Sequence, residues 1–165
     1  MGTRARSLFS FPNPVNEVAA RIVAGVVVVL CVLAISLGQG WILAVLAYGF
    51  WARVLTGPTL SPLGQFATRI APRLGPARLV AGPPKRFAQA MGVAFSSTAV
   101  VLWFGFSLHP EALVVTGLLA GAALLESAFA ICLGCRVFGY LMRTGIVPAE
   151  VCEACADLSS RLNPV

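Results

Sequence analysis

The uncharged stretch IVAGVVVVLCVLAISLGQGWILAVLAYGFWA, residues 22–52, decides how the chain folds. As one straight helix these 31 residues would be about 46 Å long, well beyond the hydrocarbon core of a bilayer, which is about 30 Å thick. The chain must therefore turn, and Gly38-Gln39-Gly40 lies at the middle of the stretch. We expect a helical hairpin with membrane helices over residues 18–37 and 41–56.

The rest of the chain shares this apolar character. Of its 165 residues, 58% are hydrophobic and only 11% are charged, and the mean hydropathy is +0.88. A soluble domain usually carries about 25% charged residues. With 16 Gly and 11 Pro to interrupt apolar helices, these values indicate an integral membrane protein made of one domain, residues 1–165. They exclude a disordered chain, a coiled coil and a collagen-like chain.

Two further apolar stretches, residues 87–108 and 111–135, predict a second hairpin, which turns near His109-Pro110. The expected fold class is therefore all-α, an integral membrane four-helix bundle built from two hairpins. Between residues 112 and 135 the only charged residue is Glu126.

The segments outside these helices are basic or polar. The loop over residues 57–86 is rich in Pro and basic residues, and Ser61-Pro62 begins a short amphipathic helix that suits the membrane surface. Residues 136–165 are expected to form a cytoplasmic hairpin that ends in a short polar helix after Pro148.

The net charge of +6 and the pI near 9.6 are interpreted as a signal of membrane topology and not of nucleic-acid binding. No basic run is interleaved with aromatic residues, and the two short turns contain no Lys or Arg. All twelve basic residues lie before the first membrane helix or near its start, at the end of the second, between the second and third, or after the fourth. The positive-inside rule therefore predicts four spans, with both termini and the basic loop in the cytoplasm.

Four of the five cysteines form two close pairs. Cys132-Leu-Gly-Cys135 and Cys152-Glu-Ala-Cys155 give the pattern C-x2-C-x16-C-x2-C, whose spacing suits a tetrahedral zinc site or two interacting redox dithiols. The predicted topology puts all four thiols at the cytoplasmic face, where thiols stay reduced. The lone Cys31 is interpreted as a small apolar residue of its helix.

The cysteine pairs support two hypotheses that spacing alone does not separate. In the first, the protein is a thiol redox or sulfur relay with a soluble partner of thioredoxin or sulfurtransferase type. Cys152 or Cys155 then attacks, because that pair lies early in a helix, and Cys132 and Cys135 receive from the carboxyl end of theirs. In the alternative, the protein is a non-catalytic membrane scaffold whose four cysteines bind a structural zinc ion. Zinc is the one cofactor that the pattern suggests.

Glu126 is predicted to lie deep in the membrane, where an unpaired carboxylate is costly. Counting along the helices places Ser96, Ser97 and Thr98 at the same depth, so we expect these side chains to be its hydrogen-bond partners. The arrangement is either a structural clamp between two helices or part of a path for a proton, an ion or a substrate. The second interpretation makes the protein a small transporter.

Other chemistry has little support in the sequence. His109 is the only histidine, and no Ser-His-Asp set, phosphate-binding loop or dinucleotide-binding fingerprint is present, so no enzyme class is assigned. Gly117 and Gly121 begin a stripe of small residues that suits close helix packing within the chain or a homo-oligomer.

Three segments resemble a family of small bacterial membrane proteins of unknown function that is frequent in actinobacteria. They are Asn13-Pro-Val-Asn-Glu17 with Arg21, Gly82-Pro-Pro-Lys-Arg-Phe-Ala-Gln89, and Cys132-Leu-Gly-Cys135 with Tyr140. The resemblance spans most of the chain and implies a bacterial inner-membrane protein. Because the family has no established activity, it assigns no role to these residues.

Overall fold

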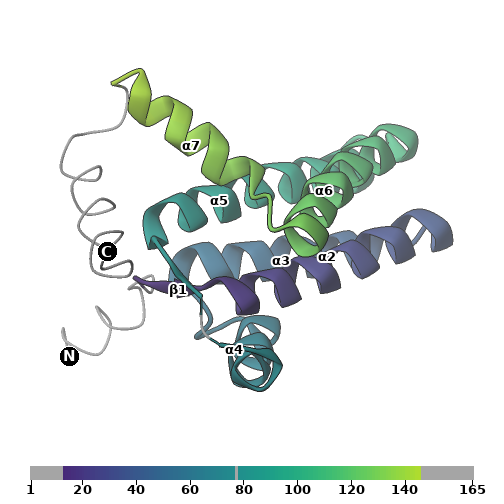
Figure 1. Cartoon of the computed structure of the whole chain (residues 1–165). Coiled ribbons are helices and arrows are strands. Elements are labelled where there is room, and N and C mark those ends of the chain that lie inside the picture. Colours follow the sequence, from purple (N-terminus) through teal and green to yellow (C-terminus); the bar gives the residue numbers. More distant parts are fainter. Residues whose placement is uncertain (1–12, 77, 146–165) are drawn as a thin grey trace, which may run out of the picture.

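The structure is a computed structural model that describes residues 13–76 and 78–145, and this part of the chain is mostly helical (Figure 1). The elements in chain order are β1 (Val15–Asn16), α2 (Glu17–Leu37), α3 (Gly40–Thr56), α4 (Pro62–Leu74), β2 (Leu79–Val80), α5 (Gly82–Val100), a π-helical segment η1 (Val101–Gly105), α6 (His109–Phe129) and α7 (Leu133–Arg143). The described residues thus form six α-helices, where the sequence predicted a bundle of four.

Three helical segments are long and apolar enough to cross a membrane: Glu17–Leu37, Gly82–Gly105 and His109–Phe129. The helix α3 is also apolar but shorter. Large apolar side chains cover the outer surface, and Trp41 and Leu118 are 61% and 60% exposed. A surface of this kind suits contact with lipid better than contact with water.

Local signals in the sequence explain how α2 and α3 are delimited. The side-chain oxygen of Asn16 accepts a hydrogen bond from the backbone N–H of Val18, at 2.9 Å, and so caps the start of α2. Gly38, with φ of 59°, ends α2 in the left-handed conformation that glycine adopts without strain. The chain then turns and returns as α3 beside α2 (Figure 1).

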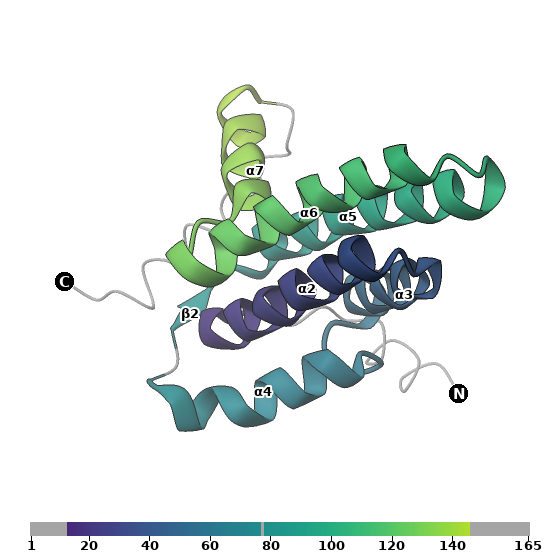
Figure 2. The ribbon, with the colours of Figure 1, turned by 90° about the vertical axis from the view of Figure 1, so that its right-hand side faces the viewer.

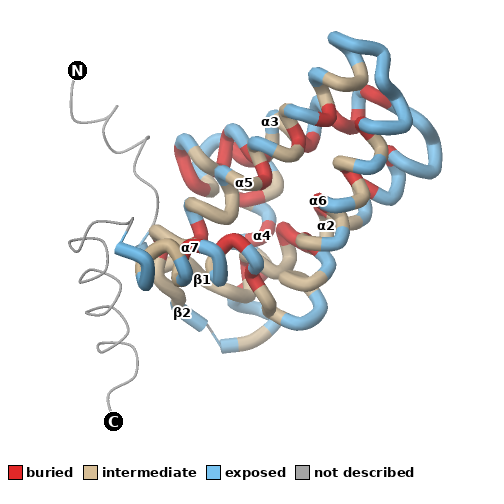
Figure 3. Tube along the Cα trace, turned by 90° about the horizontal axis from the view of Figure 1, so that it is seen from above, coloured by how far each residue is buried: buried red, intermediate tan, exposed pale blue. Residues whose placement is uncertain are grey.

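The long helices pack with α2 against α6 and α3 against α5, while α5 also contacts α6 (Figure 2). Their buried residues lie on the sides that face neighbouring helices, and the outer sides are exposed (Figure 3). Small side chains such as Ala34, Ala99 and Ala112 are almost fully buried, so the helix backbones approach closely.

The two ends of the long helices contain different connections and neighbouring helices. The "turn end" contains the connections at residues 38–39 and 106–108. The "thiol end" contains the first residues of α2 and α5 and the last residues of α3 and α6, with α4 and α7 beside them. At the thiol end β1 pairs with β2, with Val15 opposite Val80, and the backbone N–H of Gly82 donates to the side-chain oxygen of Asn13 at 3.0 Å.

The short helix α4 begins after Ser61, whose hydroxyl oxygen accepts from the backbone N–H of Gly64 at 3.1 Å. Its residues Ala67 and Ala71 are fully buried, and α4 packs against α2. Arg69 and Arg73 are exposed on its other side. The helix is therefore amphipathic, with its basic side chains directed outward.

The prediction of one helix over residues 111–135 is wrong at its carboxyl end. The helix α6 ends at Phe129, because Ala130 adopts a left-handed conformation with φ of 58° and its N–H bonds to the carbonyl of Glu126. The chain then starts α7 in a new direction, and α7 packs on α5 (Figure 1). The predicted helix after Pro148 and the pair Cys152 and Cys155 lie outside the described residues.

Candidate functional site

Cys132 and Cys135 lie at the beginning of α7 rather than at the carboxyl end of the preceding helix, where we expected them. Cys132 is the residue that caps α7, and its sulfur accepts a hydrogen bond from the backbone N–H of Cys135 at 3.3 Å. The thiol of Cys135 also donates to the Cys132 sulfur, and the two Sγ atoms are 2.7 Å apart. Because the amino-terminal end of a helix favours negative charge, α7 supports a thiolate on Cys132, whereas the carboxyl end of a helix would oppose one.

The two thiols are unequal. The pKa of Cys132 is lowered, above all by the hydrogen bond from the Cys135 thiol, although burial acts in the opposite direction. The same hydrogen bond and burial raise the pKa of Cys135. Cys132 is 9% exposed, and Cys135 is half-buried. The pair therefore consists of a buried thiolate-forming cysteine and a more accessible thiol that stabilises it.

Glu126 forms an ion pair with Lys85, whose ammonium nitrogen lies 2.7 Å from the carboxylate. The expected partners lie elsewhere. The Ser96 hydroxyl donates to the carbonyl of its own helix at Gly92, and the Ser97 hydroxyl accepts from the indole N–H of Trp51. No described hydrogen bond joins Thr98 to Glu126. The prediction that Ser96, Ser97 and Thr98 bind Glu126 is therefore wrong.

The error about Glu126 follows from the two helix ends. Because α6 stops at Phe129, Glu126 lies in the last turn of its helix and not well inside a longer helix. Because α5 starts at Gly82 and not at residue 87, Lys85 belongs to its first turns and turns inward, where it is 7% exposed. The signal was present in the Gly82–Gln89 segment, where Lys85 follows two prolines that suit a helix start.

A second buried polar pair lies next to the ion pair. The guanidinium Nε of Arg53, which is 6% exposed, donates to the side-chain oxygen of Gln89 at 2.8 Å. The Arg53 guanidinium also lies over the ring of Phe50, 4.5 Å from its centre. Sequence reasoning placed Arg53 at a helix end but missed Gln89, since a glutamine near a helix start is not distinctive by itself.

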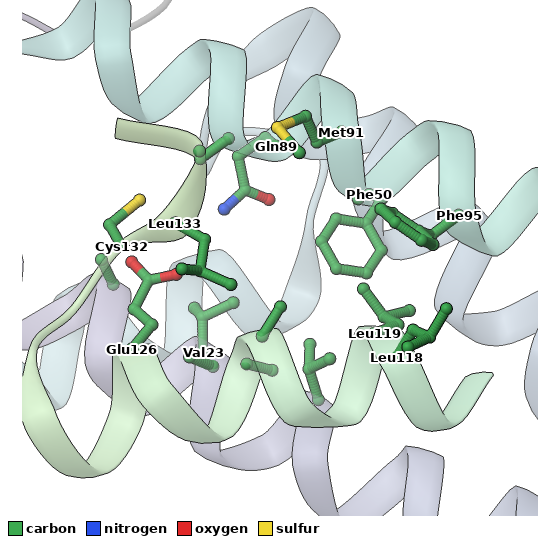
Figure 4. A pocket seen from close by; sticks show the side chains of 18 residues that line it. Val23, Phe50, Gln89, Met91, Phe95, Leu118, Leu119, Glu126, Cys132 and Leu133 are labelled. Carbon is green, nitrogen blue, oxygen red and sulfur yellow. The ribbon is translucent and has the colours of Figure 1, made fainter. Parts of the chain in front are cut away.

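Two of these polar residues, Glu126 and Gln89, border an apolar cavity of about 280 Å³ (Figure 4). Residues of α2, α3, α5 and α6 form its walls, and Leu133 and Gly134 of α7 line it as well. Glu126, Gln89 and Cys132 contribute its polar side chains. The arrangement thus places the Cys132 side chain beside an apolar space between helices.

The three segments behind the family resemblance meet around this site. Asn13 binds Gly82, Arg21 donates to the carbonyl of Ser127 at 3.0 Å, and α7 starts against α5. The start of α7 is so close that a Cβ on Gly134 would lie 2.5 Å from the Cα of Ala88. Segments far apart in the sequence are therefore held together where the thiols lie.

Residues 15–143, which include all of these elements, match the family described as Domain of unknown function (DUF4395). The chain belongs to this family. No curated protein and no solved structure matches the chain. Membership agrees with the resemblance to a family without an established activity. The DUF4395 domain includes Cys132 and Cys135 and ends before the second cysteine pair.

The other predicted sites of the DUF4395 chain are the zinc ligands, the lone cysteine and the stripe of small residues. Within residues 13–76 and 78–145, no group of three or more His, Cys, Asp or Glu side chains is arranged to bind a metal ion. Two of the four predicted zinc ligands, Cys152 and Cys155, are outside these residues. Cys31 is fully buried in the core. At Gly117 and Gly121 an added Cβ would meet nothing within 4 Å, so neither glycine packs closely within the chain.

Proposed function

We propose that this DUF4395 protein is a membrane thiol–disulfide oxidoreductase that exchanges electrons with a soluble dithiol protein through Cys132 and Cys135. One observation carries the proposal: at the start of α7 the Cys132 sulfur accepts hydrogen bonds from both the backbone N–H and the thiol of Cys135. This geometry stabilises the thiolate that thiol exchange requires. A disulfide bond is about 2.05 Å long, so the two sulfurs need only a small approach to form one.

The order of the thiol–disulfide exchange steps follows from the different exposure and pKa of the two cysteines. In the oxidised protein a thiolate of the partner attacks the Sγ of Cys135, the more accessible sulfur. The Cys132–Cys135 bond breaks, and Cys132 leaves as a thiolate, which its low pKa favours. The partner's second thiolate then attacks the mixed disulfide, so the partner gains a disulfide bond. Cys135 leaves as a thiolate and takes up a proton, and the pair has then gained two electrons.

Charge distribution supports an orientation for this reaction. Lys85 and the described arginines lie at the thiol end or on α4 and α7 beside it, whereas the connections at residues 38–39 and 106–108 contain no Lys or Arg. By the positive-inside rule the thiol end then faces the cytoplasm of a bacterial inner membrane, with α2, α3, α5 and α6 crossing the bilayer. Soluble proteins of thioredoxin or sulfurtransferase type are the partners that fit such a site.

The other hypotheses make different demands on the cysteines. A sulfur relay needs only one acceptor thiol, whereas the close second sulfur favours disulfide formation. A structural zinc site needs Cys152 and Cys155 as well. Transport through Glu126 needs a carboxylate that changes its partner, and here Lys85 holds it in an ion pair.

The test measures the disulfide directly. The purified chain is equilibrated in glutathione buffers of graded potential, and its free thiols are alkylated and located by mass spectrometry. We expect Cys132 and Cys135 to titrate together as a two-electron pair, and a single-cysteine thioredoxin to be trapped on Cys135. Replacing either cysteine by Ser abolishes both results, while Cys31→Ala, the matched control, changes neither.

Two outcomes would refute the redox proposal. One is a Cys132–Cys135 pair that stays reduced in every buffer. The other is stoichiometric bound zinc that protects all four paired cysteines from alkylation until a chelator is added, which would favour the structural staple.

A further inference from the structure

The cavity beside the thiols presents a hydrogen-bond donor without an acceptor. Arg53 offers only donors, so the side-chain atom of Gln89 that faces it must be the oxygen. The amide nitrogen of Gln89 consequently points away from Arg53, and Figure 4 shows it directed into the cavity toward Leu133 and Glu126. Among the described residues, none accepts a hydrogen bond from this nitrogen. The cavity is therefore suited to a ligand that carries an acceptor oxygen.

The rest of the cavity suits a flat apolar ring. An engineered protein cavity of about 150 Å³ holds benzene, so a cavity of about 280 Å³ has room for a substituted ring. Phe50 and Phe95 lie together along one wall (Figure 4). Leu118 and Leu133 line the cavity and are also 60% and 40% exposed, so it reaches the apolar outer surface of the helices. A ligand dissolved in the membrane can thus enter from the side.

Cys132 connects this cavity to the redox pair. Its side chain is buried and lines the cavity, whereas Cys135 is half-buried and does not line it. A soluble protein therefore meets Cys135 more readily, and a molecule inside the cavity meets Cys132. The pair separates two electron-transfer partners that never need to touch each other.

We propose that the cavity binds the head group of a lipid-soluble quinone, which accepts the two electrons of the Cys132–Cys135 pair. One ring carbonyl accepts a hydrogen bond from the Gln89 amide, and the ring lies against the apolar walls next to Cys132. The acyl chain of a lipid would fill the same walls but would leave the Gln89 donor unused. The inference rests on the proposed thiol–disulfide activity and names the membrane substrate of that site.

The reaction balances with the groups present. The Cys132 thiolate and the Cys135 thiol are oxidised, and a sulfur–sulfur bond forms between them. Two electrons pass to the quinone. The proton of the Cys135 thiol and one proton from solution complete the quinol. Together with the exchange step, a soluble dithiol is oxidised to a disulfide and a quinone is reduced to a quinol.

The experiment uses the full chain in detergent micelles under anaerobic conditions, with decylubiquinone as the probe. All its ring carbons are substituted, which disfavours permanent thiolate adducts. The protein is reduced, freed of reductant and mixed with the quinone, and quinol absorbance and free thiols are followed together. We expect one quinol to appear for every two thiols lost, with the disulfide located at Cys132 and Cys135.

Three variants separate binding in the cavity from a reaction in free solution. Gln89→Glu replaces the donor by an oxygen and keeps the acceptor that Arg53 needs, and Ala122→Phe places a ring among the cavity walls, where Ala122 now lies. We expect each to slow quinol formation about tenfold or more, the size of effect that losing a buried hydrogen bond produces. Leu124→Phe adds a ring to the exposed side of the same helix and should leave the rate unchanged. If Ala122→Phe does not fold, Gln89→Glu decides, because it keeps the partner of Arg53.

The outcomes distinguish this inference from the proposed function. A chain that exchanges normally with glutathione but reduces no quinone keeps the thiol activity and overturns the quinone site. Equal rates in the parent chain and in Gln89→Glu overturn it as well, because the reaction then does not use the cavity. A chain that forms no Cys132–Cys135 disulfide in glutathione buffers refutes the proposed function, and the quinone inference falls with it.

Discussion

The thiol end and the turn end of the molecule are stabilised in different ways. At the thiol end, helices are joined by the Lys85–Glu126 ion pair, by the Arg53–Gln89 hydrogen bond and by Arg21 on the carbonyl of Ser127. At the turn end, no side-chain hydrogen bond between the described residues joins two helices. There the buried hydroxyl of Thr116 bonds to its own helix at Ala112, and Trp103 stacks on His109.

The polar contacts between helices are thus concentrated at the end of the molecule that contains the thiols. Buried ionic and polar pairs are costly to keep in an apolar environment and tolerate the loss of one partner badly. Their concentration around Cys132 means that the protein maintains them where the reactive groups are positioned. The turn end holds the same helices together by packing, which includes small residues and the contact between Trp103 and His109.

The largest contrast is expected from breaking one buried pair. Glu126→Leu leaves the buried ammonium of Lys85 without its partner and should lower the free energy of unfolding by about 3–5 kcal/mol. The double replacement Lys85→Met with Glu126→Leu should recover most of this loss. At the turn end, Thr116→Val should cost about 1 kcal/mol or less. Unfolding in mixed micelles measures all three, and equal losses for Glu126→Leu and Thr116→Val would contradict the comparison.

A smaller effect is expected where α7 docks. Gly134→Ala would place a Cβ 2.5 Å from the Cα of Ala88, so the backbone must shift at a cost of about 1–3 kcal/mol. As α7 moves away, Cys132 should react faster with iodoacetamide. Gly139→Ala, on the same helix but with nothing within 4 Å, should be neutral or stabilising. Melting curves and alkylation rates check this pair, and similar behaviour of the two variants would rule out the docking contact.

A change confined to the turn end should affect stability without affecting reactivity. Gly38→Ala forces a side chain onto a residue with φ of 59° and should cost about 1–2 kcal/mol. Because the thiols lie at the other end, the alkylation rate of Cys132 should stay the same. A clear change in that rate would show that the two ends are coupled more strongly than the structure indicates.

The mildest test changes only the pH. A lowered pKa means that more Cys132 is already thiolate at neutral pH, so its alkylation rate should reach a plateau below about pH 8.5, the ordinary pKa of a thiol. Cys135, whose pKa is raised, should still be accelerating above that pH. In Cys135→Ala the main cause of the shift is gone, and the Cys132 plateau should move to higher pH. An unchanged profile would remove Cys135 from this role.

The sequence predicted the apolar helices better than it predicted their ends. Glycines at residues 38 and 40 mark the first turn, and composition alone marks the apolar stretches. The end of α6 has no such signal, because Ala130 adopts a left-handed conformation that alanine rarely takes. Because the helix ends there, Cys132 and Cys135 lie at the start of α7 and not at the end of the predicted helix. The helix dipole at this position favours a thiolate, whereas at the predicted position it would oppose one.

The candidate site was harder to predict because it depends on contacts between distant segments. Cys132, Cys135 and Glu126 were identified from residue type and spacing. Lys85 and Gln89 were not, since their roles arise only when α5 begins at Gly82 and packs against α3 and α6. Periodicity describes one helix at a time and contains no information about which side chains meet across helices.

The pairing of β1 with β2 allows the chain between the two strands to vary in length. The two strands close a loop that contains α2, the turn, α3 and α4, and they fix the start of α5 against the start of α2. The entropy of closing a loop grows only with the logarithm of its length, so even a twofold longer loop would cost about 0.6 kcal/mol more. Insertions between α4 and β2 should therefore be well tolerated, whereas a shift of one residue in the strand pairing would move Lys85 and Gln89 out of register with Glu126 and Arg53.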